Sequence, residues 1–331
     1  LAPDPSAPVP PSRRPSFSVV IAAWQAAPTV GEAIRSALAQ TEPPVEVIVC
    51  DDGSTDTTAE VLAGFGDRIR VLRQPNLGES AAKNAAVRAA GGDFVVILDA
   101  DDRWDPRRLR RLGDLAAARP DLDLLTTDAW FLVDGERRGR FYAAAGAFPV
   151  RDQSTEILRR NFFFSHVAVR RTAWLASGGF DREVARAADW DFWLRLLFAG
   201  HLAGCVAEPL ADYRIHPASL SAERASSLMA RVDVLDRAGA TQRLGPAQRE
   251  VLSRARATYL RRARAARAER ALLDGAPGRR RACLDLLVAP GGSVRSRALA
   301  AAAALAPGLA AGRLRRDRER GGRARSDRAI S

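Results

Sequence analysis

Lysine is almost missing from this chain, although its 331 residues carry 51 lysine and arginine side chains. Lys83 is the only lysine, so nearly all of the positive charge is arginine. Residues 1–250 hold 31 basic and 33 acidic side chains, whereas residues 251–331 hold 20 basic and 6 acidic ones. A protein that binds nucleic acid over most of its surface is basic throughout. The charge distribution instead predicts a near-neutral body with a basic docking element at its end.

Paired cysteines and long apolar runs are also lacking. Cys50, Cys205 and Cys283 lie far apart without a CxxC pair, so the sequence indicates neither a zinc site nor a disulfide framework. We therefore expect a reducing, cytoplasmic setting. No stretch reaches the roughly 18 apolar residues that are typical of a membrane span. Residues 1–15 are rich in proline and lack the apolar core of a signal peptide, which predicts a disordered leader.

Strand-like and helix-like segments alternate along the first third of the chain. The apolar, β-rich runs are residues 17–24, 45–51, 69–74 and 93–99. Segments with helical spacing or helix-capping residues lie between them. This alternation predicts right-handed βαβ units in an α/β fold, with a mainly parallel sheet flanked by helices. Beyond residue 222 the sequence is rich in Ala, Arg and Leu, which predicts helices. Its glycine and proline content rises after residue 276, which predicts partial disorder there.

Acidic residues follow the fourth predicted strand in the stretch VVILDADDRW. Charged side chains at the end of a buried strand need compensation. Asp99 and Asp101 could converge on one hard cation such as Mg²⁺ or Mn²⁺, which prefers oxygen ligands and shares them with substrate phosphates. The alternative is a solvated turn in which Asp102 or Asp105 caps the next helix.

A second acidic pair, Asp51 and Asp52, follows the second predicted strand in VIVCDDGSTDTT. Helix capping explains residues 54–57 but does not explain two adjacent acids before them. A carboxylate that accepts a hydrogen bond from an N–H of a nucleobase would explain one of the two. Both clusters are expected at the same edge of the sheet, where parallel α/β folds bind ligands.

Several motifs together resemble family 2 glycosyltransferases of the GT-A (Rossmann-like) fold, of a non-processive bacterial type. They are SVVIAAWQAAPTVGEAIRSALAQTEPPVEVIVCDDGSTDTT, RQPNLGESAAKNAAVRAAGGDFVVILDADDRW, ASGGFDREVARAADWDFWLRLLFAG and ADYRIHPASLS. The resemblance covers about residues 16–222 in order. It implies a nucleotide-binding half over 16–104 and an acceptor half over 105–222, followed by a helical basic extension over 223–331.

The resemblance also implies roles in binding a nucleotide-diphospho-sugar donor. Trp24 stands where the family places an aromatic that stacks on the base, and Asp52 matches the acid that reads it. Asp99 and Asp101 match the D-x-D pair, with Asp101 in direct metal contact and Asp99 at the ribose or the metal. Lys83 lies in a segment that often faces the donor, although a solvated helix face would also explain it.

A catalytic base and a further metal ligand are implied in the acceptor half. Asp189 matches the acid that deprotonates the acceptor hydroxyl, a role that one-step transfer requires. It is also a natural N-cap for the helix at 190–199. The family often has a second acid just before this position, where this chain has Ala188, so Asp191 is the alternative base. His216 matches a family position near the metal and the diphosphate.

These residues together predict an inverting, metal-dependent glycosyltransferase that uses Mn²⁺ or Mg²⁺. UDP-sugars are the favoured donors, and the acceptor is a glycan or lipid-linked hydroxyl in cell-surface polysaccharide or cell-wall synthesis. The QxxRW motif of processive synthases is missing after Asp189. One alternative is a haloacid-dehalogenase-like phosphotransferase, which normally has a threonine two residues after the second acid, where this chain has Arg103. Another is a non-catalytic scaffold whose basic tail binds nucleic acid or membrane.

The arginine-rich tail has few aromatic residues, which argues against nucleic acid as its partner. Peripheral contact with anionic lipid at the inner face of the cell membrane is one expectation. A helical extension with a solvated arginine face is the other.

Overall fold

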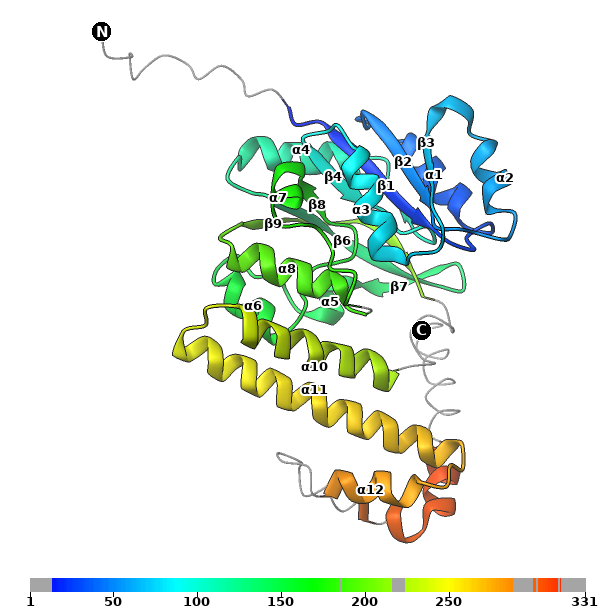
Figure 1. Ribbon diagram of the computed structural model, residues 1–331, viewed down its shortest axis with the longest axis vertical. Coiled ribbons are helices and arrows are strands. Elements are labelled where there is room, and N and C mark those ends of the chain that lie inside the picture. Colours follow the sequence, from blue (N-terminus) through cyan, green and yellow to red (C-terminus); the bar gives the residue numbers. More distant parts are fainter. Residues whose placement is uncertain are drawn as a thin grey trace. The chain divides into compact units, whose positions relative to one another are not determined.

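The computed structural model describes residues 14–184, 186–215, 224–287, 300–301, 303–314 and 316. The chain divides into two compact units, residues 1–216 and 217–331. The first unit contains a mixed sheet, and the second is helical in its described part (Figure 1).

The first half of the sheet is parallel and follows the predicted βαβ pattern. Its strands are β1 (Phe17–Ala23), β2 (Glu46–Asp51), β3 (Arg70–Arg73) and β4 (Phe94–Ile97), in the spatial order β3-β2-β1-β4. The connecting helices are α1 (Val30–Leu38), α2 (Thr58–Ala63) and α3 (Glu79–Ala89), with a 3₁₀ turn at Gly66–Arg68. Each predicted strand and helix of this half is present, with ends that differ by a few residues.

Beyond β4 the sheet becomes mixed and continues in the order β8-β6-β9-β5. These strands are β5 (Arg103–Trp104), β6 (Leu124–Val133), β8 (Ala168–Arg170) and β9 (Ala203–Arg214). The antiparallel β8 lies between β4 and β6, so that β6 runs parallel to β4. The helices of this half are α4 (Arg108–Ala118), α5 (Phe141–Ala145), α6 (Gln153–Arg159), α7 (Arg171–Ala176) and α8 (Ala188–Phe198).

One short strand of the sheet contains no apolar residue. β7 (Glu136–Arg140) pairs antiparallel with β6, although its five residues are charged or glycine and none is apolar. Asp134 and Gly135 connect the two strands with φ values of 50° and 83°. Two consecutive positive φ values favour a tight hairpin, so the turn residues explain a strand that has no hydrophobic pattern.

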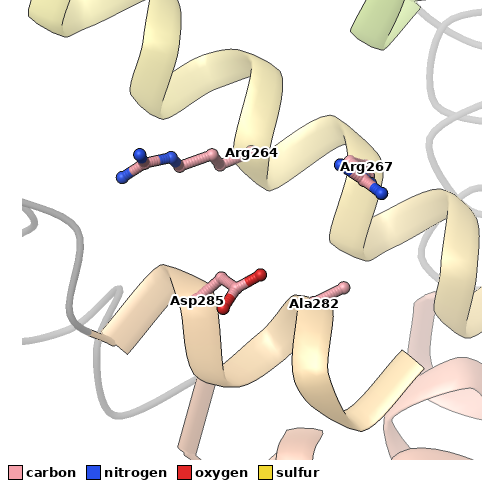
Figure 2. Close-up of a pocket in the computed structure, with 4 residues that line it drawn as sticks. All are labelled: Arg264, Arg267, Ala282 and Asp285. Atoms are coloured by element: carbon pink, nitrogen blue, oxygen red, sulfur yellow. The ribbon is translucent and has the colours of Figure 1, made fainter. Parts of the chain in front are cut away.

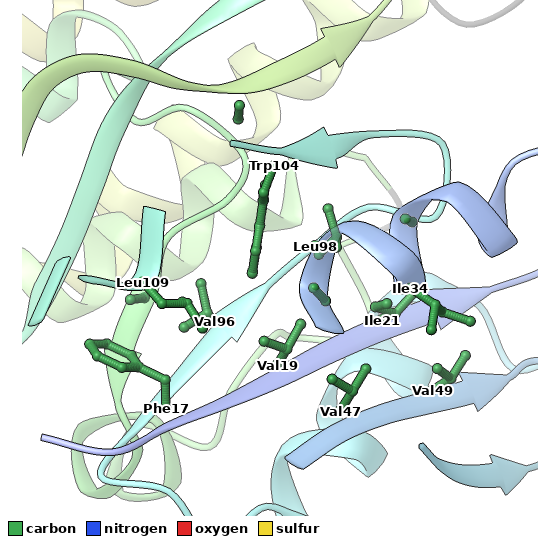
Figure 3. Close-up of a cluster of buried hydrophobic side chains, with 14 of the residues drawn as sticks. Phe17, Val19, Ile21, Ile34, Val47, Val49, Val96, Leu98, Trp104 and Leu109 are labelled. Carbon is green, nitrogen blue, oxygen red and sulfur yellow. The ribbon is translucent and has the colours of Figure 1, made fainter. Parts of the chain in front are cut away.

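The main hydrophobic core lies between the parallel strands and the helices α1 and α4. Alternate residues of β1, Val19 and Ile21, are fully buried and face Ile34 of α1 and Leu109 of α4 in one cluster (Figure 3). On the same face, Leu98 precedes the acidic stretch at the end of β4. The rigid core therefore extends to the residue before Asp99.

The second unit contains α10 (Arg224–Thr241), α11 (Pro246–Leu273) and α12 (Arg279–Leu287). The helices α10 and α12 each pack on α11. A small cluster of Ala268, Leu272, Cys283 and Ala304 forms the core around α12. Among the described residues, no helix is both long and apolar enough to cross a membrane.

Truncation of a central side chain tests the core. Ile21 is fully buried in β1, so we expect Ile21→Ala to lower the free energy of unfolding by about 2–5 kcal/mol and Ile21→Val by about 0.5–1.5 kcal/mol. Urea denaturation followed by circular dichroism measures both. Val150→Ala is the control because Val150 is 84% exposed, and an equal loss there would contradict this description of the core.

Candidate active site

The acidic ends of β2 and β4 meet at one edge of the sheet. The strand β1 pairs in parallel with β2 on one side and with β4 on the other. The backbone N–H of Asp52 donates to the carbonyl of Ala23 at 2.8 Å, which aligns the ends of β1 and β2. The predicted donor-site residues therefore leave neighbouring strands in the same direction, as expected for a ligand site in such a sheet.

Asp52 is buried and holds the segment that leads into α3. One carboxylate oxygen accepts from the Gln74 side chain at 2.6 Å and from the Leu77 N–H at 2.9 Å, while the other accepts from the Gly78 N–H at 2.8 Å. Gly53 allows this close approach, because a Cβ atom there would lie 2.7 Å from the backbone nitrogen of Asn76. Asp52 thus has an anchoring role in the protein itself, and its predicted contact with a base stays a prediction.

Trp24 is the one large aromatic residue of the described chain that is strongly exposed, at 57%. It follows β1 and precedes Gln25, whose φ of 51° is unusual for a residue other than glycine. The Gln25 side chain accepts from the backbone N–H of Thr55 at 2.9 Å and donates to the Thr55 hydroxyl at 3.0 Å. This clamp fixes the turn that presents Trp24, so the ring is available for stacking.

Asp99 is neutralised by Lys83. The Lys83 ammonium donates to Asp99 at 2.8 Å and also pairs with Glu79 one helical turn earlier. Lys83 is buried, so the alternative of a solvated helix face is wrong. Burial lowers the pKa of Lys83, but Asp99 and Glu79 outweigh that effect and raise it. Burial likewise raises the pKa of Asp99, and the Lys83 charge overcomes it, so the carboxylate stays ionised beside a buried cation.

Asp102 faces the interior, where it meets His166. The distance between His166 Nε2 and an Asp102 oxygen is 2.9 Å, and both side chains are fully buried. On the other side of the ring, Trp104 donates its indole N–H to Nδ1 at 3.0 Å. A neutral imidazole that accepts at Nδ1 carries its proton on Nε2, the atom that lies next to the Asp102 carboxylate. Burial lowers the pKa of His166 to about 3, which keeps the ring neutral.

Arg108 is a further buried residue that contacts His166. Its guanidinium is fully buried and donates to the Thr127 hydroxyl and to the His166 carbonyl. Burial lowers the pKa of Arg108 to about 9. A buried cation beside a neutral imidazole disfavours a second positive charge there, which agrees with the direction of the His166 shift.

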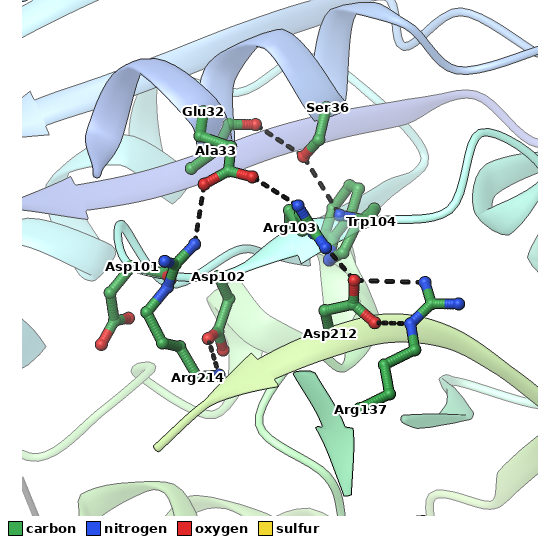
Figure 4. A network of polar contacts seen from close by, with 10 residues as sticks. All are labelled: Glu32, Ala33, Ser36, Asp101, Asp102, Arg103, Trp104, Arg137, Asp212 and Arg214. Carbon is green, nitrogen blue, oxygen red and sulfur yellow. Dashed lines mark hydrogen bonds and ion pairs between the residues drawn. The ribbon is translucent and has the colours of Figure 1, made fainter. Parts of the chain in front are cut away.

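Asp102 also fixes the last strand of the unit. Its second carboxylate oxygen accepts the Arg214 N–H at 2.6 Å, and the Arg214 side chain donates to the Asp101 carbonyl at 2.8 Å and to Glu32 at 2.7 Å (Figure 4). The prediction that Asp102 forms a solvated, helix-capping turn is wrong, because Asp102 is buried and accepts from Arg214, while Asp105 accepts the Arg107 N–H just before α4. Asp102 instead holds β9 against the acidic loop.

Asp189 lies in the first turn of α8. The helix begins at Ala188 with Ala187 at the N-cap, so the suggestion that Asp189 is itself the N-cap is wrong. Its carboxylate accepts from the Asn161 side-chain amide at 2.8 Å. Burial raises the pKa of Asp189 above its ordinary value, a shift expected to favour a base that works near neutral pH. Asp191 is buried and pairs with Arg195 at 2.9 Å.

Tyr213 of β9 shows which acids gather at the site. Burial raises the pKa of its hydroxyl, and four carboxylates add to that effect. They belong to Asp99, Asp102, Asp101 and Asp189. The predicted base and the predicted metal pair therefore face one region, although 88 residues separate Asp101 from Asp189 in the sequence. His216, the further predicted metal ligand, lies outside the described residues.

The site also contains side chains whose roles the sequence did not reveal. Asn161, Trp104, Gln25 and His166 were not assigned roles from the sequence. Their functions depend on partners 28 to 62 residues away. Trp174 and the phenylalanines at 162–164 are buried in the core.

The residues present fit a hard divalent cation. Asp99, Asp102 and His166 offer ligand atoms that lie within 4.8 Å of one another. Because Nε2 of His166 carries the proton that faces Asp102, oxygen atoms are the better donors in this cluster. Carboxylate oxygens are also the ligands that Mg²⁺ and Mn²⁺ prefer.

The α/β sheet with acids at its carboxyl edge agrees with the GT-A fold that the sequence resembles, and structural comparison supports this fold. Mannosyltransferase PcManGT from Pyrobaculum calidifontis, solved with GDP-Man and Mn²⁺, matches with a TM-score of 0.60 at 22% identity. The match covers 89% of this chain and 81% of that one. At this level of identity the likeness shows the fold alone.

The family model of glycosyl transferase family 2 matches residues 18–175 of the chain. The chain is similar to the hyaluronan synthase of Pasteurella multocida, with 31% identity over 57% of this chain and 19% of that protein. It is also similar to the Escherichia coli protein WfaP, a UDP-Glc:α-D-GlcNAc-diphosphoundecaprenol β-1,3-glucosyltransferase, with 26% identity over 67% and 86% of the two chains. The chain thus spans about a fifth of the length of the first of these relatives. The match to a glycosyltransferase family model disfavours the haloacid-dehalogenase alternative.

The exposure of Trp24 predicts that its removal changes binding and leaves stability unchanged. If the ring stacks on a base, we expect Trp24→Ala to weaken UDP or GDP binding by about 1–3 kcal/mol. Isothermal titration calorimetry with Mn²⁺ present measures the affinity, and thermal unfolding measures stability. Leu175→Ala on α7 removes another exposed apolar side chain and is the control. Equal nucleotide affinities in wild type and Trp24→Ala would exclude stacking.

Proposed function

We propose that this protein is an inverting, metal-dependent glycosyltransferase that moves one sugar from a nucleotide-diphospho-sugar to an acceptor hydroxyl. The observation that carries the proposal is that the carboxylates of Asp99, Asp101 and Asp189 all act electrostatically on the buried Tyr213 hydroxyl, and that Asp99 and Asp101 follow β4 at the carboxyl edge of the sheet. One partly buried base and no evident covalent nucleophile suit a single displacement. The match to a glycosyltransferase family model supports the same reaction class.

In this proposal the donor lies along the edge formed by β2, β1 and β4. Trp24 stacks on the base and Asp52 reads it, while Asp99 and Lys83 face the ribose and the diphosphate. A UDP-sugar is the favoured donor, supported by the UDP-Glc named for the relative WfaP. Asp101 and Asp99 hold Mn²⁺ or Mg²⁺, with His216 as a further candidate ligand. When bound, such an ion stabilises the departing nucleoside diphosphate.

Asp189 accepts the proton of the attacking hydroxyl. Its raised pKa makes it a stronger base than an ordinary aspartate and still leaves it ionised above that pKa. Asp191 is the less suitable candidate because its carboxylate pairs with Arg195. The ion pair of Lys83 with Asp99 keeps a positive charge beside the position proposed for the diphosphate.

We further propose a glycan or lipid-linked acceptor in cell-surface polysaccharide or cell-wall synthesis, used at the inner face of the cell membrane. The diphosphoundecaprenol in the name of WfaP supports a lipid-linked acceptor. The arginines of the second unit support contact with anionic head groups. Arg264 and Arg267 of α11 line a cavity of about 330 Å³ together with Ala282 and Asp285 of α12 (Figure 2).

The assignment of the base predicts the effect of two neighbouring substitutions. We expect Asp189→Asn to lower kcat by about 10²–10⁴-fold, because the acceptor proton then has no base. Thermal-shift screening of nucleotide sugars with Mn²⁺ identifies the donor, and release of the nucleotide diphosphate gives the rate. Asp191→Asn is the matched control and is expected to affect stability more than kcat. A large loss of kcat in Asp191→Asn with little loss in Asp189→Asn would instead identify Asp191 as the base.

The assignment of the metal ligands predicts a difference between Asp101 and His166. We expect Asp101→Asn to weaken Mn²⁺ binding in the presence of UDP by about tenfold or more, and His166→Gln to change it by less than about threefold. Glutamine retains a side-chain N–H that can donate to Asp102. The electron paramagnetic resonance signal of free Mn²⁺ measures both affinities. Comparable losses in the two variants would make His166 a ligand and contradict this assignment.

A further inference from the structure

Asp189 lies in the first turn of α8, and contacts with other segments fix the conformation of this turn. Ala187 at the N-cap of α8 has a φ of 56°, and no side chain caps the helix. A left-handed conformation is costly for a residue that has a Cβ, and such strain persists only where surrounding contacts impose it. The Asp189 carboxylate accepts from the Asn161 side-chain amide and interacts with the backbone N–H of Trp190.

Asn161 is held in one orientation by its own backbone neighbour. Its Oδ1 accepts the Phe163 N–H at 3.1 Å, so Nδ2 is the group that faces Asp189, at 2.8 Å. Asparagine oxygen and nitrogen are distinguished by such partners, and this pair leaves one consistent assignment. Phe162 and Phe163 are buried directly after it, which immobilises the segment.

A second contact ties the same two segments together. The Trp190 indole donates to the carbonyl of Ile157 in α6 at 2.8 Å. The residue next to Asp189 is thus anchored to α6, while Asp189 itself is anchored to the segment that follows α6. Two bonds from adjacent residues restrict rotation of the first turn of α8.

The charged groups around Asp189 come from three elements. Lys83 and Glu79 of α3 act on it with opposite signs, and Tyr213 faces it from β9. On α8 itself Asp191 is paired with Arg195. Asn161 is the neutral side chain that donates to the carboxylate, so its substitution by another neutral residue removes a hydrogen bond without moving a charge.

We propose that Asn161 is a positioning residue that fixes the Asp189 carboxylate and stabilises its ionised form. The proposal rests on the proposed function, in which Asp189 is the general base. A carboxylate that loses a hydrogen-bond donor binds its proton more tightly. Without Asn161, the pKa of Asp189 is therefore higher. A smaller fraction of Asp189 is then ionised at neutral pH and able to accept a proton.

The test is the titration of Asp189 by ¹³C NMR of protein labelled at the aspartate carboxyl carbons. The resonance of Asp189 is the one lost in Asp189→Asn. We expect the midpoint to rise by about one pH unit in Asn161→Ala, since hydrogen bonds to charged groups are comparable in strength to one unit of pKa. Asn161→Ser, whose hydroxyl is too short to reach, should shift it similarly and serves if Asn161→Ala does not fold. Asn161→Asp should shift the midpoint further, because two carboxylates then share the site.

The matched control is Gln153→Ala, which also removes a buried amide. The Gln153 side chain donates to the Ala203 carbonyl at 2.8 Å and accepts the Ala203 N–H at 2.9 Å, away from Asp189. We expect it to reduce stability and leave the midpoint unchanged. An Asp189 midpoint that is the same in Asn161→Ala as in wild type would overturn the proposal.

Enzyme kinetics separate this proposal from the proposed function. If Asp189 is the base and Asn161 positions it, the acidic limb of kcat/KM moves to higher pH in Asn161→Ala and the rates converge with wild type at alkaline pH. Full activity in Asp189→Asn would refute the base itself, whatever the NMR midpoints are. A loss of rate in Asn161→Ala that is equal at every pH would assign a merely structural role to Asn161.

Discussion

The ion pair between Lys83 and Asp99 is the interaction on which the rest of the site depends. Strand β4 brings a carboxylate to the edge of a fully buried core, where an isolated charge would be costly. The only lysine of the chain, presented by α3, neutralises it at 2.8 Å. A second acid, Asp102, lies with one oxygen beside the His166 ring and accepts the backbone N–H of Arg214 with the other. With both acids held in this way, the loop that carries Asp101 has a fixed start and a fixed end.

That arrangement separates two kinds of acid in one short stretch. Asp102 faces inward, where Trp104 fixes the tautomer of the imidazole beside it. Asp99 faces the edge beside a cation, and Asp101 lies close enough to Tyr213 to affect the pKa of its hydroxyl. Three side chains with metal-binding chemistry therefore do not make three equivalent ligands, because the hydrogen bonds decide which atoms are available.

Much of the fold and part of the site could be predicted from the sequence. Strands β1, β2 and β4 are short apolar runs, and their alternation with helices indicated the parallel half of the sheet. The strand β7 could not be predicted from hydrophobicity, because it has no apolar residue and its turn determines the pairing. The acids could be recognised as sequence motifs. The burial of Lys83 on α3 could not, because it depends on contact with Asp99, which follows β4 and lies 16 residues away in the sequence.

The sequence by itself determined which functional side chains are present and in what order they occur along the chain. Its apolar runs fix where strands end, and its acids follow two of those ends. Only the tertiary structure decided which atom of each side chain is free to act. Asn161 meets Asp189 across 28 residues, and Trp104 meets His166 across 62. Such contacts arise from the packing of whole elements, so no local pattern of residues encodes them.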